Sequence, residues 1–295
     1  MLAAGLTRRE LESAVNRGEL TRPRRGWYAN RLADDDQLRA VVAGARIGCV
    51  SALRRWGVWS GEGDRLHLQV PRTSSGLVLR EAPRGAQLRV PHPAWELPLD
   101  WAIRPCDAAG PVAHWVPPLQ PHRALDWIVS PVDALAQAVR CQREEHALAC
   151  VDSALHEGVV TLAEWEAVLA SLPARLRALD EYKDSRADSG NETIVRLRLR
   201  RLGLRSEPQV RLPGIGFIDL LVEGLVPLEV DSEAHHSSHG QRQRDRSRSL
   251  LSAALGSPTL RIGPEHLTAR EWPLVVVAID RQLADARGRT VNRLF

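Results

Sequence analysis

The sequence predicts a mixed α/β protein (α+β, several domains). One observation is length, because 295 residues exceed what a single hydrophobic core ordinarily organises. Another is the polar stretch ALDEYKDSRADSG at 178–190, which has no apolar period and predicts a linker. After it the patterns run helix, extended segment, hairpin, loop, helix, strand, which predicts a C-terminal αβββαβ core. The resulting segments are 1–30, 31–125, a helical connector at 126–180, the linker 181–190 and a final domain at 191–295.

Composition is that of a globular chain, with 44% hydrophobic and 26% charged residues. No stretch approaches about 18 uncharged apolar residues, so no transmembrane helix is predicted. The first residues, MLAAGLTRRELES, are charged where a signal peptide needs an apolar core, which predicts a cytoplasmic protein. Lys183 is the only lysine. The basic side chains are therefore almost all arginines, which suit phosphates and base edges and are compatible with DNA as a partner.

Residues 1–30 predict a helix followed by a small basic hairpin. Thr7 and Glu10 form a capping-box pattern, and Gly18 ends the helix. Winged-helix modules place hairpin arginines on DNA phosphates, and a solvated hairpin is the alternative. The segment resembles the short winged-helix module at the start of AbiEi-type antitoxins, which implies binding of DNA or of a partner protein. The arginines concerned are Arg22, Arg24 and Arg25.

Residues 31–125 are interpreted as a middle α/β region, similar to proteins that carry AbiEi-like N-termini. The region shows no recognisable chemistry. Its histidines stand singly between prolines and are predicted to be loop residues, not metal ligands; they are His92, His114 and His122. The cysteines form no C-x-x-C pair and are predicted to be small buried side chains without a metal role. They are Cys49, Cys106, Cys141 and Cys150.

The run PLEVDSEAHH at 227–236 gathers acidic and imidazole groups at the end of an apolar strand. Glu229 and Asp231 are two apart, so they share a strand face. Asp219 lies on the partner strand of the predicted hairpin, whose turn falls near Glu223. A loop of odd length puts Asp219 on the face of Glu229 and Asp231, whereas a two-residue loop puts it on the opposite face.

Carboxylates on one face repel one another unless a proton or a cation neutralises them. Oxygen ligands favour Mg²⁺ or Mn²⁺, which activates water and neutralises a leaving oxygen in phosphodiester hydrolysis. Glu192, at the start of the preceding helix, is predicted to reach the site as a base or outer ligand. His235 and His236 are candidate general acids or bases. The alternative is an acidic strand end that runs into a polar loop.

The segment GQRQRDRSRSLLSAAL predicts a basic helix at 241–255. Arginines three and four residues apart share a helix face and would hold phosphates beside the acidic site. A solvated basic face is the alternative. The arginines are Arg242, Arg244, Arg246 and Arg248.

The E…D…E-x-D…H order within 188–275 resembles the PD-(D/E)xK nuclease superfamily, and is most similar to its very-short-patch-repair-endonuclease-like bacterial branch. The resemblance implies a restriction-endonuclease-like fold, with Asp219 and Glu229 as metal ligands and Glu192 as a supporting acid. Asp231 stands where the superfamily usually has lysine. Members of this branch also lack that lysine and use histidine, which points to His235 or His236.

The sequence therefore predicts a magnesium- or manganese-dependent DNA endonuclease in repair or defence. The alternative is a DNA-binding regulator or antitoxin-like protein whose nuclease-like domain is inactive. DNA is the expected partner and a membrane is not. A homodimer, and a protein partner bound through the N-terminal region, remain open.

Overall fold

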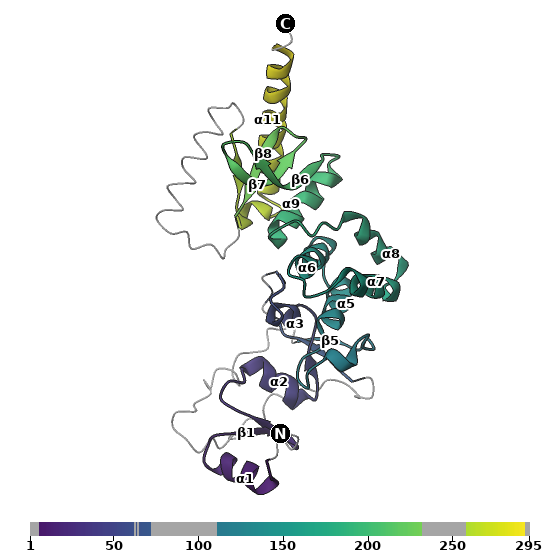
Figure 1. Ribbon diagram of the computed structural model, residues 1–295, viewed down its shortest axis with the longest axis vertical. Coiled ribbons are helices and arrows are strands. Elements are labelled where there is room, and N and C mark those ends of the chain that lie inside the picture. The colour runs from purple at the N-terminus through teal and green to yellow at the C-terminus, as the bar shows by residue number, and fades with distance from the viewer. Residues whose placement is uncertain (1–5, 62, 64, 72–110, 232–257, 293–295) are drawn as a thin grey trace. The chain divides into compact units, whose positions relative to one another are not determined.

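A computed structural model describes residues 6–61, 63, 65–71, 111–231 and 258–292. Within this part of the chain, helices are mixed with three small sheets, so the predicted α+β class is confirmed. Two compact units are present, and Figure 1 labels their elements. Unit 1 is Met1–Trp56 with Glu62–Ala138, and unit 2 is Gly57–Gly61 with Val139–Phe295.

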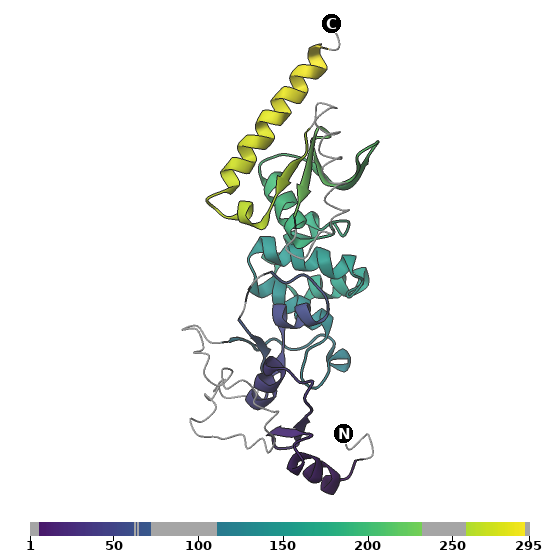
Figure 2. The same ribbon diagram turned by 90° about the vertical axis from the view of Figure 1, so that its left-hand side faces the viewer.

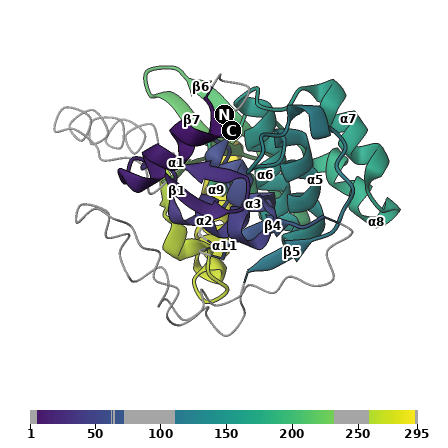
Figure 3. The same ribbon diagram turned by 90° about the horizontal axis from the view of Figure 1, so that it is seen from below.

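Unit 1 contains a two-stranded hairpin, β1–β2, and a three-stranded sheet. In that sheet β3 pairs antiparallel with β4, and β4 pairs parallel with β5. Figure 3 shows β4 and β5 side by side next to α3. The division between the units passes through α5. The elements are α1 (Arg8–Asn16), β1 (Thr21–Arg24), β2 (Trp27–Ala29), α2 (Asp35–Ala43), β3 (Arg46–Ile47), α3 (Cys49–Arg55), β4 (His67–Gln69), β5 (Val112–His114), η2 (Pro121–Arg123) and α5 (Pro131–Cys141).

Unit 2 places helices against a four-stranded sheet of order β6-β7-β8-β9. The sheet is antiparallel except for the β8–β9 pair. Figure 2 shows the long helix α11 alongside this sheet. The elements are α6 (Glu144–His156), α7 (Leu162–Ser171), α8 (Ala174–Arg177), η3 (Ala178–Tyr182), α9 (Gly190–Arg201), β6 (Ser206–Leu212), β7 (Gly216–Val222), β8 (Val226–Val230), β9 (Leu260–Ile262), η4 (Pro264–Leu267) and α11 (Trp272–Asn292).

Capping residues begin and end α1 as the sequence predicts. At α1 the Thr7 hydroxyl accepts the Glu10 N–H at 3.3 Å, and the Glu10 carboxylate accepts the Thr7 N–H at 2.7 Å. The chain leaves this helix through Gly18, whose φ of 74° favours glycine. Thr161 and Glu164 form the same reciprocal pair at the start of α7. Side chains thus satisfy N–H groups that a helix start otherwise leaves without partners.

The core of unit 2 joins the sheet to α9 and α11. On α11 the buried Val275, Ile279 and Leu283 recur every fourth residue and so form one stripe. On α9 the inward residues are Val195 and Leu199. They pack with alternate strand residues, which share one face of the sheet. The strand members of this core are Leu220, Val222, Val226, Leu228, Val230 and Ile262.

The segment predicted as a linker, 181–190, is instead packed inside unit 2. Leu179 of the adjoining η3 and Ala187 are buried. The backbone N–H of Asp184 donates to the carboxylate of Asp152 on α6 at 2.8 Å. The polar composition was misleading because these charged residues pair with protein groups as well as with water.

Helix α9 begins at Gly190, close to the indole of Trp59. A Cβ added at Gly190 would lie 2.2 Å from Cδ2 of that ring. The ring makes a T-shaped contact with His146, and the backbone N–H of Trp59 donates to the Ser153 hydroxyl at 2.9 Å. We therefore expect Gly190→Ala to lower the free energy of unfolding by about 1–3 kcal/mol through overpacking.

The matched control is Gly288→Ala in the exposed part of α11, where an added Cβ meets nothing within 4 Å. An unobstructed alanine in a helix should raise the free energy of unfolding by about 0.5–1 kcal/mol. Urea denaturation of both variants measures the two effects. If Gly190→Ala and Gly288→Ala change the free energy of unfolding equally and in the same direction, the steric role of Trp59 is contradicted.

Candidate functional site

The hairpin of β7 and β8 has the odd-length loop that the acidic site requires. Val222 pairs with Val226, which leaves Glu223–Leu225 as a three-residue connection. Glu223 and Gly224 take φ values of 51° and 68°, left-handed conformations that close the turn. The sequence placed the turn at these residues and left the loop length open.

The carboxylates lie where the two strands stop pairing. The β7–β8 ladder ends at Leu220 and Leu228. Asp219 and Glu229 are each one residue farther from the turn, so they leave the same face of the hairpin. There Asp219 Oδ2 accepts the N–H of Val230 at 2.7 Å, and β8 pairs with β9.

Glu192 is a buried carboxyl group in the first turn of α9, with 3% of its surface exposed. Its Oε2 accepts the N–H of Asp188 at 3.1 Å and the amide of Gln209 at 3.0 Å. Burial first, and then the negative charge of Asp219, raise the pKa of Glu192 from 4.5 to about 7. Glu192 and Asp219, which the sequence placed in one site, therefore interact electrostatically.

Gln209 is a site residue that the sequence reading missed. It lies across from Asp219 in the β6–β7 pairing, where the ladder is interrupted. Its φ of 53° is unusual for a side-chain-bearing residue within a strand. Such conformations cost on the order of 1–3 kcal/mol and cluster at functional sites. The irregular backbone lets Gln209 donate its side-chain amide to Glu192.

Glu229 and Asp231 have different surroundings. Glu229 is mostly buried and forms an ion pair with Arg261, its cross-strand neighbour on β9, with 2.9 Å between Oε2 and Nη2. Asp231 lies just beyond β8 and is exposed, and its N–H donates to Ile262 O at 2.9 Å. A cation that took Glu229 as a ligand would have to compete with the Arg261 guanidinium.

Other predicted site residues fall outside the described part of the chain. They are the two candidate acid–base histidines and the arginines of the expected basic helix at 241–255, namely His235, His236, Arg242, Arg244, Arg246 and Arg248.

The N-terminal arginines lie on the β1–β2 hairpin and are exposed. Arg22 lies over the ring of Tyr28, 5.8 Å from its centroid. The Arg24 guanidinium occupies the space beside Gly44 at the C-terminal end of α2, where a helix dipole favours a cation. Arg25 follows β1 in the turn. Arg24 therefore has a local structural contact, and the hairpin presents Arg22 and Arg25.

A different group of side chains could hold a metal ion, although the sequence predicted no such role for them. The group comprises Cys49, His67, His114 and Cys141, whose donor atoms all lie within 4.8 Å of one another. His114, expected in a loop, is buried on β5. Thiolate and imidazole ligands are typical of zinc, whereas magnesium and manganese prefer carboxylates.

Among the described helices, none combines the length and the apolar character that crossing a membrane requires. Comparison with family models, curated proteins and solved structures gave no match to this chain.

Proposed function

We propose that the C-terminal domain hydrolyses phosphodiester bonds of DNA with a bound Mg²⁺ or Mn²⁺ ion. The observation that supports this most is the meeting of Glu192 with Asp219 where β7 and β8 stop pairing. Glu229 leaves the same face of the hairpin. Glu192 on α9 and Asp219 on β7 thus interact, Glu229 on β8 shares the strand face of Asp219, and a hard divalent cation suits oxygen ligands.

The donors fit such an ion on electrostatic grounds. Glu192 has a pKa raised to about 7, so near neutral pH it either keeps a proton or needs a compensating positive charge. Asp219 is held by the Val230 N–H at 2.7 Å, which fixes its carboxylate between the strands. Preorganised acidic groups of this kind favour a cation over bulk water.

In the proposed reaction Asp219 and Glu229 would hold the ion, and Glu192 would support them from the first turn of α9. A bound divalent cation would polarise the attacking water and neutralise the leaving oxygen. An ion bound by Glu229 would displace the Arg261 guanidinium from its ion pair. The freed guanidinium would lie beside the site and could bind a phosphate oxygen. The general base is assigned to His235 or His236, and the arginines at 242–248 to the flanking phosphates.

A second candidate is a DNA-binding regulator whose nuclease-like domain is inactive. The exposed Arg22 and Arg25 on the β1–β2 hairpin favour it, because a basic hairpin binds phosphates without cleaving them. The exposed Asp231, in place of the superfamily's usual lysine, also favours it.

Cleavage of supercoiled and single-stranded DNA by the purified protein, with Mg²⁺, Mn²⁺ or EDTA, tests the two candidates. Asp219→Asn keeps an oxygen for the Val230 N–H but removes the negative charge. We expect it to lower the cleavage rate about a hundredfold or more, since losing a metal ligand costs several kcal/mol and each 1.36 kcal/mol is a tenfold change.

The matched control is Asp280→Asn on the exposed face of α11, which should cleave like the wild type. No cleavage by the wild type under any condition would overturn the nuclease proposal. Salt-sensitive DNA binding that survives Asp219→Asn, without cleavage, would instead support the regulator.

A further inference from the structure

Two buried histidines of unit 1 come from neighbouring parallel strands. His67 on β4 pairs with Val112, and Gln69 pairs with His114 on β5. The histidines are therefore two residues out of register, on the same face of the sheet. His67 Nδ1 and His114 Nε2 are 3.2 Å apart, and the rings are stacked.

Cys49 is held beside these rings by the turn that follows β3. The Gly48 N–H donates to the His67 carbonyl at 2.9 Å, which brings the turn against β4. Cys49 itself has a φ of 50°, a conformation that costs a non-glycine residue about 1–2 kcal/mol. Its N–H donates to the Gln137 side chain at 2.8 Å. Strain at a side chain with metal-binding chemistry is a recognised mark of a functional position.

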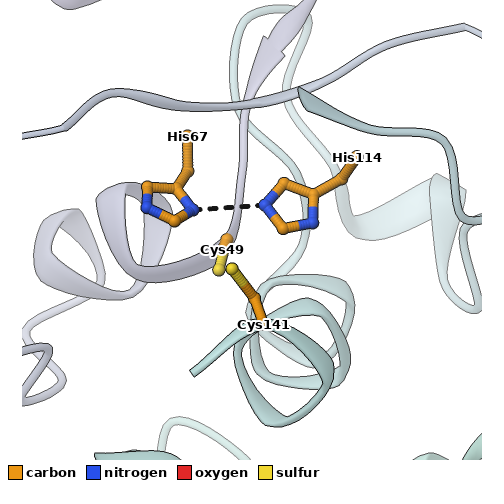
Figure 4. A group of neighbouring side chains, drawn as sticks. All are labelled: Cys49, His67, His114 and Cys141. Atoms are coloured by element: carbon orange, nitrogen blue, oxygen red, sulfur yellow. Dashed lines mark hydrogen bonds between the residues drawn. The ribbon is translucent and has the colours of Figure 1, made fainter. Parts of the chain in front are cut away.

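Cys141 is brought to the same place by helix α5. It is the last residue of α5 and lies four residues after Gln137, so the two share one face of a continuous helix. The buried Gln137 amide also donates to the Gln69 side chain of β4, which docks α5 on the sheet one turn before Cys141. Figure 4 shows the sulfur atoms of Cys49 and Cys141 next to each other, beside the two imidazole rings.

The two histidine nitrogens have nearly the spacing of ligands in a tetrahedral metal centre. Ligands about 2.0–2.3 Å from a tetrahedral zinc ion lie about 3.3–3.8 Å from one another. The two histidine nitrogens are 3.2 Å apart, and all four donor atoms lie within 4.8 Å of one another. We propose that Cys49, His67, His114 and Cys141 form a structural Cys₂His₂ zinc site.

The donor set selects the metal and the role. Two thiolates and two imidazoles favour zinc over hard cations such as Mg²⁺. Four protein ligands complete the tetrahedron, so no position remains for a catalytic water. His67, His114 and Cys49 are buried, and Cys141 is the least buried member. The ion would fasten the β3–α3 turn and strands β4 and β5 to the end of α5.

Two metal-free arrangements of the same side chains are the alternatives to a zinc site. The histidine pair can share an N–H···N hydrogen bond, and the two sulfurs can form a disulfide. Neither rival binds metal, and the disulfide removes two of the chain's four thiols. Cys150 offers a matched control, because burial in α6 raises the pKa of its thiol to about 12 and keeps it protonated.

Zinc analysis of the full-length protein, purified with a thiol reductant and dialysed against EDTA, tests the site. We expect one zinc ion per chain in the wild type and in Cys150→Ala. Cys141→Ser and His114→Ala should lose their zinc to the chelator. Cys141→Ser changes the least buried ligand, so circular dichroism can show that its fold survives. Asp219→Asn should keep its zinc, which separates this site from the carboxylate site.

Cobalt substitution gives an independent signature. Tetrahedral cobalt bound by two thiolates should show strong visible absorption and a sulfur-to-metal charge-transfer band, both lost in Cys141→Ser. A wild type that holds no zinc after reconstitution under reducing conditions would overturn the proposal. Equal zinc retention in the folded ligand variants would also overturn it. In protein purified without reductant, only two titratable thiols after denaturation with chelator would identify the disulfide instead.

Discussion

Glu192→Gln is expected to raise the free energy of unfolding at pH 8, in EDTA, by about 3 kcal/mol and to abolish the proposed metal-dependent cleavage. The rise of the Glu192 pKa from 4.5 to about 7 in the folded protein is the reason. At 1.36 kcal/mol for each tenfold change, that difference amounts to about 3 kcal/mol. Glutamine keeps an oxygen that can accept from Asp188 and Gln209, and it carries no charge to bury.

The sign and the pH window follow from proton linkage. Between pH 4.5 and about 7 the folded wild type binds more protons at Glu192 than the unfolded chain does. Its stability therefore falls as pH rises through this window and is lowest above about pH 7. The glutamine variant lacks this dependence, so the two proteins should have similar stability near pH 4 and diverge toward pH 8.

Urea denaturation at several pH values measures this divergence. The matched control is Glu166→Gln on the exposed face of α7, which should change the free energy of unfolding by less than about 0.5 kcal/mol. Added Mg²⁺ should stabilise the wild type at pH 8 and leave Glu192→Gln unchanged. The test compares the stability advantage of Glu192→Gln over the wild type at pH 4 and at pH 8. An advantage that does not grow toward pH 8 would contradict a buried charge at Glu192.

Local patterns in the sequence were sufficient where neighbouring residues determine the structure. The capping pair of α1, the turn at Glu223 and the order of α9, β6, β7 and β8 are of this kind. Strand periodicity also predicts that Glu229 and Asp231 leave one face, but it does not by itself place Asp219 on that face. The loop length between β7 and β8 needed the structure, since odd and even turns both close hairpins.

The Cys/His cluster could not be predicted from spacing. Its members lie on α3, β4, β5 and α5, and no short interval in the sequence joins them. His67 and His114 meet only because β4 and β5 pair in parallel across a long connection. The prolines near His114 pointed to a loop, whereas parallel pairing made that residue part of a buried strand.

The sequence did not predict the role of Gln209 or the contacts of segment 181–190, for different physical reasons. The left-handed φ of Gln209 is imposed by the surrounding sheet, since glutamine has no intrinsic preference for it. In 181–190 the charged side chains are polar enough to predict solvent exposure. The backbone N–H of Asp184 in this segment nevertheless donates to a buried acid, Asp152, a contact that no local sequence pattern reveals.

The largest loss of stability is expected for Arg196→Met on α9. Arg196 donates to Asp152 at 2.6 Å, and both side chains are almost fully buried. Asp152 also accepts from the Thr193 hydroxyl at 2.9 Å and the Asp184 N–H at 2.8 Å. Removing the guanidinium leaves a buried carboxylate without its counter-charge, which costs about 3–5 kcal/mol.

A double-mutant cycle measured by urea denaturation isolates this pair. Asp152→Asn combined with Arg196→Met removes both charges and should recover part of the loss. The control is Arg8→Met in the exposed Arg8–Glu12 pair, where the expected change is about 0.3–0.5 kcal/mol. Additive effects at Asp152 and Arg196 would contradict a coupled buried pair.

The pH dependence of Arg196→Met adds a second check. Burial raises the pKa of Asp152 to about 6 even though Arg196 lowers it. Without that cation the pKa should rise further, so Asp152 takes up a proton in the folded variant and the loss shrinks at pH 5 relative to pH 8. Thr193, which hydrogen-bonds to Asp152, is adjacent to Glu192 on α9, so we expect this network to help position Glu192. Arg196→Met should therefore also reduce the proposed cleavage, although Arg196 is assigned no contact with DNA or metal in that proposal.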